Sequence, residues 1–437
     1  MTKLNAGAGK CAIRYTEEMF PSPGENYTSI HDLPSAQTLV LECGGEKTAL
    51  VAINVVMFDD RNEIARRAAG ILNIAEENVI VHITHVLATP HFGHWDSVEQ
   101  WMARHHECSD LEEARRYMVR ENMIYQAHMD AVEEACRRAA GSMRPARLAI
   151  GTAYAEVNVN RVVNTDQGWW QGVNWGGETD RNVAVLRIDG EDGKGIAVLY
   201  NCNVAPGCME FSETSDGGRA VSGDLANASQ SVTESLLNDG AVAIYTTGAT
   251  GDQWQALRAR LDWIDPDGTQ TVTDLHEAGF DLMKVLATRL GERVAQTAAA
   301  LTPADFEGGL ALCSRRFAYE GQRVTGADFR RPAKQCVYEP AGTVDSELKI
   351  LTLGDIAIVC CGVELNVSSL KKIRNASPYK HTFLLEFAVG GGGYMPTSEF
   401  YDRITFQSLK SRYAKGAEER FVQDIIRTLQ EHHSQAQ

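Results

Sequence analysis

Short runs of β-branched and apolar residues recur along this chain and alternate with segments of helical periodicity. Each run has the length of one strand and ends in polar or glycine-rich residues, as strands do when they lead into surface loops. This alternation predicts an α/β architecture. The predicted strands are 38–43, 48–56, 78–83, 147–154, 183–188, 196–204, 242–248, 348–353, 356–361 and 382–389. The predicted helices lie near 61–74, 110–140, 224–238, 279–301 and 417–433.

The chain has 437 residues, which is enough for a large buried core. We predict mixed β-sheets with flanking helices in a single domain over residues 1–437, and the pattern allows two lobes, about 1–240 and 241–437. His128 lies on the apolar stripe of the longest predicted helix. A histidine in such a stripe is typically packed and hydrogen-bonded, so we expect a structural role for it.

Charge and composition exclude several classes of partner. The formal charge is −16, from 58 acidic and 42 basic residues without a long basic cluster, which argues against nucleic acid and anionic membranes. No segment approaches the roughly 18 continuous apolar residues of a membrane helix. The first residues also lack the layout of an export signal. We therefore expect a cytoplasmic protein that acts on a small molecule, and the sequence leaves a homo-oligomer open.

Polar residues follow several of the predicted strands. Ligands of open α/β sheets bind beyond the carboxyl ends of strands, because loops and helix N-termini converge there. The polar loops read HITHVLATPH, NVNRVVN, NVAPGCME, TGATGDQWQ, GVELN and GGGGYMPTSEFY. Their histidine, arginine, acidic and tyrosine side chains suit hydrolysis better than redox or phosphoryl transfer, since the sequence has no GxGxxG motif or P-loop lysine.

Four histidines, His82, His85, His91 and His94, lie close together in the segment HITHVLATPHFGH. His82 and His85 stand three residues apart at a strand end, where successive side chains alternate between faces. We therefore expect His82 to be structural. His91 and His94 lie on a turn that contains proline and glycine, and such a turn can fold back toward His85.

Tryptophans cluster shortly after Arg161. The segment GWWQGVNWGG places Trp169, Trp170 and Trp175 in a glycine-rich loop, which predicts either an aromatic wall over a pocket or a loop anchored in the core. Asn160 directly precedes Arg161 and is a candidate for substrate binding. A guanidinium at a strand end is suited to hold a substrate carboxylate or a developing oxyanion, and equally to brace a carboxylate of the protein.

Nine short blocks follow one another in an order that is typical of a known family. They read GAGKCAI, THVLATP, EVNVNR, TDRNVAVLRID, NVAPGCM, SGDLANA, GATGDQWQ, GVE and GGYMPTSEFY, and they extend to about residue 410. Together they resemble the N-terminal catalytic domain of the neutral/alkaline ceramidases, which are zinc-dependent amidases of N-acyl sphingosines. The resemblance implies that catalytic-domain fold without the family's C-terminal immunoglobulin-like domain.

The resemblance also implies a metal site. Three of the family's four zinc ligands have counterparts in this chain, namely His85, Glu364 and Tyr394. The position of the second histidine ligand is occupied by Ala205, so a zinc ion would need a replacement. The candidates are His91, on its turn, and Cys208, three residues beyond Ala205.

Other positions around the family's reaction centre are partly kept. Arg161 and Asp252 match the family, and the resemblance implies that Arg161 stabilises an oxyanion while Asp252 orients ligand or water. Three positions differ from the family. Leu87 stands in place of a histidine, Trp254 in place of a serine and Phe406 in place of a tyrosine.

Two functions follow from the resemblance. The first is a hydrolase of the amidase type, in which a metal-held water attacks a small soluble amide or ester. Ceramide itself is not expected, because the chain shows neither an export signal nor a lipid-side domain. The alternative is a metal-free descendant, either a non-hydrolytic enzyme or a small-molecule-binding protein, and the substitutions at the reaction centre favour it.

Overall fold

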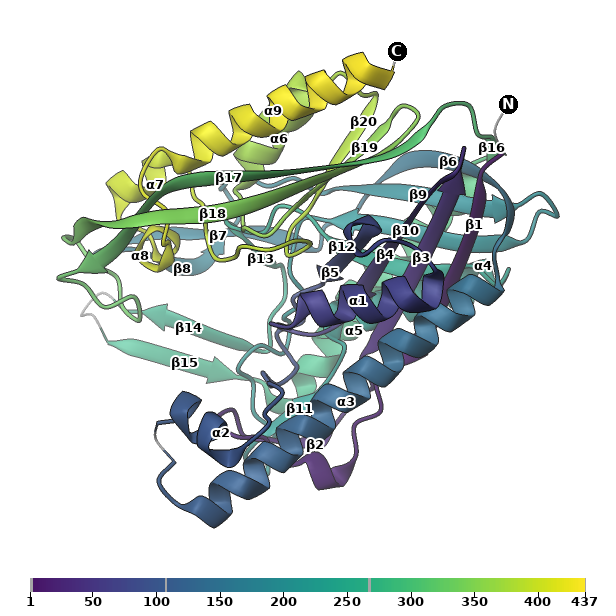
Figure 1. Cartoon of the computed structure of the whole chain (residues 1–437). Helices are drawn as coiled ribbons and strands as arrows, with labels where there is room; N and C mark the ends of the chain where they lie inside the picture. Colours follow the sequence, from purple (N-terminus) through teal and green to yellow (C-terminus); the bar gives the residue numbers. More distant parts are fainter. Residues whose placement is uncertain (1–2, 107, 266–268, 437) are drawn as a thin grey trace.

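A nine-stranded mixed sheet forms one inner layer of the computed structural model, which describes residues 3–106, 108–265 and 269–436 (Figure 1). Its strand order is β12 (Val242–Thr247), β10 (Gly195–Cys202), β9 (Asn182–Gly190), β6 (Arg144–Tyr154), β1 (Asn5–Ala12), β3 (Ser35–Cys43), β4 (Glu46–Ile53) and β5 (Val79–Ile83). The short β16 (Ala304–Asp305) pairs with β6. The β4–β5 and β10–β12 pairs are parallel, and the other pairs are antiparallel.

A four-stranded sheet stacks on this layer. It runs in the order β17 (Leu310–Thr325), β18 (Val337–Leu353), β19 (Ile356–Cys361) and β20 (His381–Leu385). Leu39 and Leu199 of the larger sheet share one buried apolar cluster with Leu351 and Phe383 of the smaller sheet. Both β19 and β20 are apolar along most of their length because they are covered on both faces.

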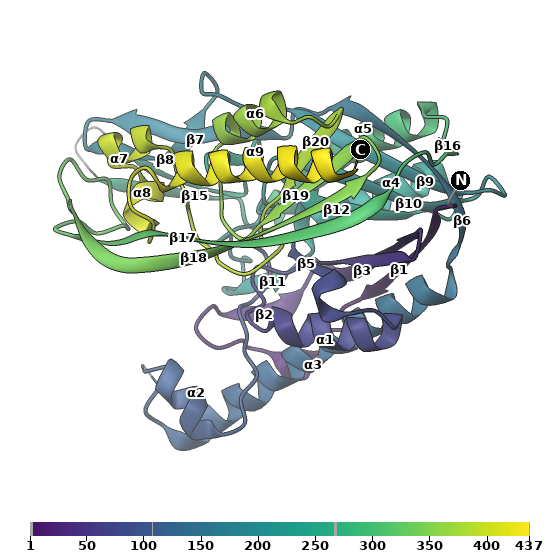
Figure 2. The same ribbon diagram turned by 45° about the horizontal axis from the view of Figure 1, so that its top comes forward.

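Helices cover the outer faces of both sheets. On the larger sheet, α1 (Arg61–Leu72) and α3 (Leu111–Gly141) pack over β3 and β4, and α4 (Asp224–Leu237) and α5 (Gly279–Ala300) pack over β9 and β10. On the smaller sheet, α6 (Val367–Ala376) and α9 (Ala417–Ala436) form the outer layer, as both views show (Figures 1 and 2). The order of layers is therefore helix, sheet, sheet, helix. None of the described helices has the length and apolar character needed to cross a membrane.

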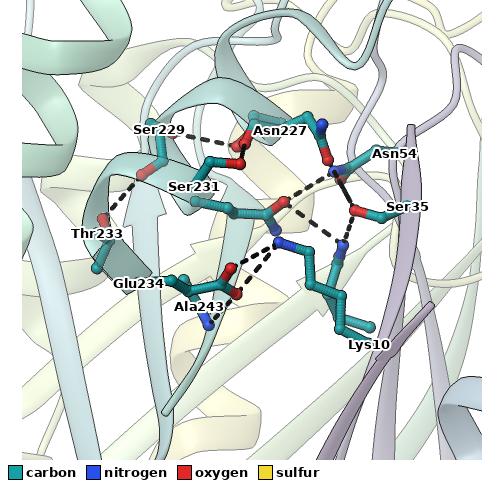
Figure 3. A network of polar contacts seen from close by, with 12 residues as sticks. Lys10, Ser35, Asn54, Asn227, Ser229, Ser231, Thr233, Glu234 and Ala243 are labelled. Carbon is teal, nitrogen blue, oxygen red and sulfur yellow. Dashed lines mark hydrogen bonds and ion pairs between the residues drawn. The ribbon is translucent and has the colours of Figure 1, made fainter. Parts of the chain in front are cut away.

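Polar contacts fasten α4 to the sheet that it covers (Figure 3). The Lys10 ammonium of β1 lies 3.0 Å from the Glu234 carboxylate, which also accepts a 3.0 Å hydrogen bond from the backbone N–H of Ala243 in β12. The Ser35 hydroxyl of β3 donates to the side-chain oxygen of Asn227 at 2.8 Å. These contacts join α4 to three strands of the sheet, so that the helix is held by directional bonds as well as by apolar packing.

The predicted mixed sheets with flanking helices are confirmed, and several elements were missed. The segments 158–165 and 168–174 were expected to be loops, but they form β7 (Asn158–Thr165) and β8 (Gly168–Asn174) of a small sheet with β13 (Gln253–Gln255). Their asparagine and glycine content hides the strand pattern. Two further pairs are β2 (Tyr27–Ile30) with β11 (Arg219–Val221) and β14 (Arg260–Ile264) with β15 (Gln270–Asp274). The division into two lobes stays a prediction.

His128 has the packed role expected from its position in α3. Its Nδ1 lies 2.7 Å from the carbonyl oxygen of Ile124, and its Nε2 lies 3.3 Å from the Tyr15 hydroxyl. Burial lowers the pKa of His128 to about 4, so the ring is neutral at physiological pH.

Glycines of β1 allow α3 to approach the sheet closely. A Cβ atom built on Gly9 would lie 2.2 Å from the carbonyl oxygen of Ala135, whereas one built on Gly70 in α1 would meet open space. We predict that Gly9→Ala destabilises the fold by about 2 kcal/mol or more, because rigid backbone must move. The control Gly70→Ala should be neutral or stabilising by up to about 1 kcal/mol. The midpoint of urea unfolding measures both effects, and equal midpoints for the two variants would contradict the prediction.

Candidate functional site

Several strand ends meet where the two large sheets join, and the buried Glu386 links them. Its carboxylate accepts hydrogen bonds from Leu365 N at 2.6 Å, from Thr250 Oγ at 2.6 Å and from Thr250 N at 3.0 Å. Thr247 N donates to His82 Nε2 at 3.1 Å, so His82 Nδ1 carries the proton and donates to the Glu386 carbonyl at 2.9 Å. These bonds join the ends of β5, β12, β19 and β20, and they give His82 the structural role that was expected.

Arg161 is buried on β7, beside this junction. Its guanidinium donates to the Gly251 carbonyl at 3.1 Å and to the Tyr394 hydroxyl at 2.8 Å, and it lies 3.9 Å from the Glu364 carboxylate. Its backbone N–H donates to the Asp252 carbonyl at 2.9 Å. The structure therefore brings together Arg161, Glu364, Tyr394 and Asp252, four of the residues singled out in the sequence.

Glu364 follows β19 and is held in place by main-chain bonds on both sides. Its N–H donates to Gly393, and its carbonyl accepts from Met395, at 3.1 and 3.0 Å. Burial raises the pKa of its carboxyl from 4.5 to about 7, although the positive charge of Arg161 acts in the opposite direction. A carboxyl with this pKa can accept and release a proton near neutral pH, which suits a general base.

His85 lies just past β5 with a left-handed backbone, at φ 59°. Its Nδ1 donates to the Val56 carbonyl at 2.6 Å, and its ring stacks on Phe387 with centroids 4.3 Å apart. Burial lowers the pKa of His85 to about 4, so the imidazole is neutral. Because Nδ1 holds the proton, Nε2 presents a lone pair that can accept a hydrogen bond or bind a metal.

Asp252 and Asn160 are occupied by contacts within the protein. The Asp252 carboxylate accepts from the N–H of Val367, the first residue of α6, and from the Gln253 amide, both at 3.1 Å. The Asn160 amide donates to the Glu178 carbonyl at 3.0 Å and lies 3.4 Å from the Asp252 carboxylate. These bonds give Asp252 a positioning role, because it fixes the start of α6 beside the site.

The three tryptophans take different positions, and the first two lie on β8 rather than in a loop. Trp170 is buried and meets Phe406 edge-on, and Phe406 meets the Tyr394 ring in the same way, with centroids 5.9 and 5.7 Å apart. Trp169 lies beneath an arginine of α7 (Ser398–Arg403). The side chain of Trp175 is largely exposed, at 62%. Of the three tryptophans, Trp170 is therefore the one whose ring contacts lead to the site, through Phe406 to Tyr394.

Sequence reasoning missed two charged residues beside this group. Glu210 and Arg258 form an ion pair at 2.8 Å, and the Arg258 guanidinium lies 4.1 Å from the centre of the Trp254 ring. Glu210 closes the segment NVAPGCME, whose polar end was visible in the sequence. Its partner comes from a different strand end, however, so no local spacing could have identified the pair.

The residues present do not fit the zinc site that the resemblance implies. His91 Nδ1 pairs with Glu25 at 2.8 Å, and burial raises the pKa of the Cys208 thiol well above its usual value. Across residues 3–106, 108–265 and 269–436, no three histidine, cysteine, aspartate or glutamate side chains gather closely enough to hold a metal ion. The Tyr394 hydroxyl accepts a hydrogen bond from the Arg161 guanidinium at 2.8 Å, so one of its lone pairs is already occupied. His85 and Glu364 therefore lack the third strong donor of a catalytic zinc site.

Solved structures of other proteins share this fold, among them two ceramidases. One is neutral ceramidase from Pseudomonas aeruginosa, with a TM-score of 0.68 and 14% identity over 98% of this chain and 74% of that chain. The other is a ceramidase complexed with C2, with a TM-score of 0.69 and 13% identity over the same shares. No family model and no curated protein matches the chain. The expected ceramidase-like fold is confirmed, and at this level of identity the likeness shows the fold alone.

We predict that the purified protein holds well under one zinc ion per chain after equilibration with zinc. The physical reason is the missing third donor, since binding free energy falls steeply when a ligand is lost. Elemental analysis of the parent, His85→Ala and Glu364→Gln proteins should give the same low value. One zinc per parent chain, lost in both variants, would contradict this expectation.

The raised pKa of Glu364 predicts a pH-dependent stability. The folded state holds this proton up to about pH 7 and the unfolded state only to about 4.5, so the stability contribution of this group falls as the pH rises between those values. Glu364→Gln keeps a neutral side chain at every pH. Its melting temperature should exceed that of the parent by a few degrees at pH 8 and match it at pH 5. A pH-independent difference would show that Glu364 titrates normally.

Proposed function

We propose that this protein hydrolyses a C–N bond in a small polar amide. The observation that carries the proposal is the buried group at the strand ends, in which Arg161 lies 2.8 Å from the Tyr394 hydroxyl and 3.9 Å from the Glu364 carboxylate. This group combines hydrogen-bond donors suited to an oxyanion with a carboxyl suited to activating water.

In the proposed reaction the substrate carbonyl oxygen accepts hydrogen bonds from the Arg161 guanidinium and the Tyr394 hydroxyl. Glu364 takes a proton from a water molecule, whose oxygen attacks the carbonyl carbon. The tetrahedral oxyanion then collapses, the C–N bond breaks, and Glu364 returns the proton to the leaving nitrogen. One amide and one water thus give one carboxylic acid and one amine. The neutral His85 accepts a hydrogen bond through Nε2 and orients the attacking water.

The two fold neighbours support the choice of bond, because both are ceramidases by name and ceramide is an amide. The polar and charged surroundings of the site support a small soluble substrate over a membrane lipid. Cytoplasmic location and assembly into a homo-oligomer stay predictions from the sequence.

A binding protein without hydrolysis is the second candidate. Trp254 and Phe406 occupy two positions at which the resemblance implies a serine and a tyrosine, and in this structure both carry aromatic contacts instead. Aromatic rings beside buried arginines can hold a ligand without turning it over.

We predict that the parent protein releases amines from members of a panel of N-acyl amino acids and simple amides. Glu364→Gln and Arg161→Gln should each lower kcat/KM by about 100-fold or more, because each removes a group that acts in the transition state. Glu112→Gln, at an exposed position on α3, is the matched control and should leave the rate unchanged. The rate should rise with pH through about 7, as Glu364 loses its proton.

The panel is read by the release of primary amine. Full activity of Glu364→Gln would show that Glu364 is not the general base. Ligand binding to the parent without release of amine from any compound would favour the second candidate.

A further inference from the structure

Arg258 is a buried arginine whose hydrogen-bonding capacity the protein uses only in part. It is 7% exposed, and its contacts to Glu210 at 2.8 Å and to the Gln255 amide oxygen at 3.3 Å both go through the same terminal nitrogen, Nη1. Its Nε has no hydrogen-bond partner among the described residues. A guanidinium offers five N–H donors in one plane, and buried donors are nearly always satisfied. The unused edge therefore calls for an acceptor that the protein does not supply.

The position of Arg258 connects it to the candidate site. Glu210, its ion-pair partner, is close enough for its charge to act on the pKa values of His85, Glu364 and Tyr394. Trp254, beneath the guanidinium, pairs in the β7–β13 ladder with the residue two places before Arg161. Glu210 and Trp254, which both contact the guanidinium, are partly exposed.

The contacts of the local charged groups leave one place for an anion. Two buried guanidiniums, those of Arg161 and Arg258, face two carboxylates, Glu210 and Glu364. Glu210 meets only one terminal nitrogen of Arg258, so the side of that guanidinium with Nε has no carboxylate hydrogen-bonded to it. An anionic oxygen group of a ligand would supply the missing acceptor.

We infer that Arg258 binds a carboxylate group of the substrate through its free edge, above the Trp254 ring. A carboxylate has two oxygens in one plane, which match two parallel N–H donors of a guanidinium. An aromatic ring stacked on the guanidinium helps to keep these donors in a fixed orientation. The inference rests on the proposed function and narrows it, because the substrate becomes an amide with a carboxylate near the scissile bond, as in an N-acylated amino acid.

Calorimetric binding of matched probes tests this inference without relying on turnover. The probes are N-acetylglycine, N-acetylleucine and N-acetylphenylalanine, each compared with its own carboxamide at pH 7.5. The parent should bind at least one acid about tenfold or more tightly than its carboxamide, because hydrogen bonds to charged groups are the strong ones. Arg258→Gln should abolish that preference.

Two further variants keep the test decisive. Arg260→Gln, two residues along and paired with Asp262 at 3.5 Å, is the matched control and should keep the preference. Arg258→Lys retains the positive charge without the planar set of N–H donors, so it should lose most of the preference for acids. This variant replaces Arg258→Gln in the test if Arg258→Gln fails to fold.

Equal binding of acids and carboxamides by the parent, or no binding of either, would overturn the inference. So would a full acid preference in both folded Arg258 variants. Hydrolysis of the same probes is followed separately by amine release. An acid preference that depends on Arg258, without any cleavage, would leave the inference standing and remove the proposed hydrolysis. Cleavage of acids and carboxamides at the same rate would support the proposed hydrolysis and overturn the inference about Arg258.

Discussion

The buried carboxylate of Glu386 is the group on which the arrangement of the candidate site depends. Burial raises its pKa well above the usual value, and backbone and hydroxyl donors surround it at 2.6 to 3.0 Å. One of those donors, Leu365 N, belongs to the residue that follows Glu364. The carbonyl of Leu365 in turn accepts from Gly251 N at 2.9 Å, and the Gly251 carbonyl holds Arg161. The position of the proposed base and the position of the proposed oxyanion donor therefore follow from one side chain.

This arrangement draws its parts from three sheets. His85 comes from the end of the larger sheet, Glu364 from the end of the smaller one, and Arg161 from the small sheet that contains β7 and β8. The apolar contact between the two large sheets fixes the first two parts relative to each other. Side chains carried by packed strands keep their geometry better than side chains on free loops, so the site is preorganised by the same packing that stabilises the fold.

The sequence predicted regular elements well and contacts between distant segments poorly. The helix expected near 110–140 spans Leu111–Gly141, because its apolar stripe is long and unbroken. Glu386 stands inside an apolar run, and an acidic residue in such a place is a signal that could have marked it as a hydrogen-bonding centre. The pair of Glu210 and Arg258 had no such signal, since it exists only after two strand ends have been brought together.

The geometry of β17 also limits how copies of this chain can meet. β17 is the outermost strand of the smaller sheet, and the edge of a long strand is a template for pairing with another chain. Here Arg315, Arg316 and Arg323 lie exposed along it, and the register shifts between Glu320 and Gln322. Two such edges brought side by side would set like charges against each other and lose their register at the bulge. The strand is thus poorly suited to extending its sheet with the same strand of a second copy.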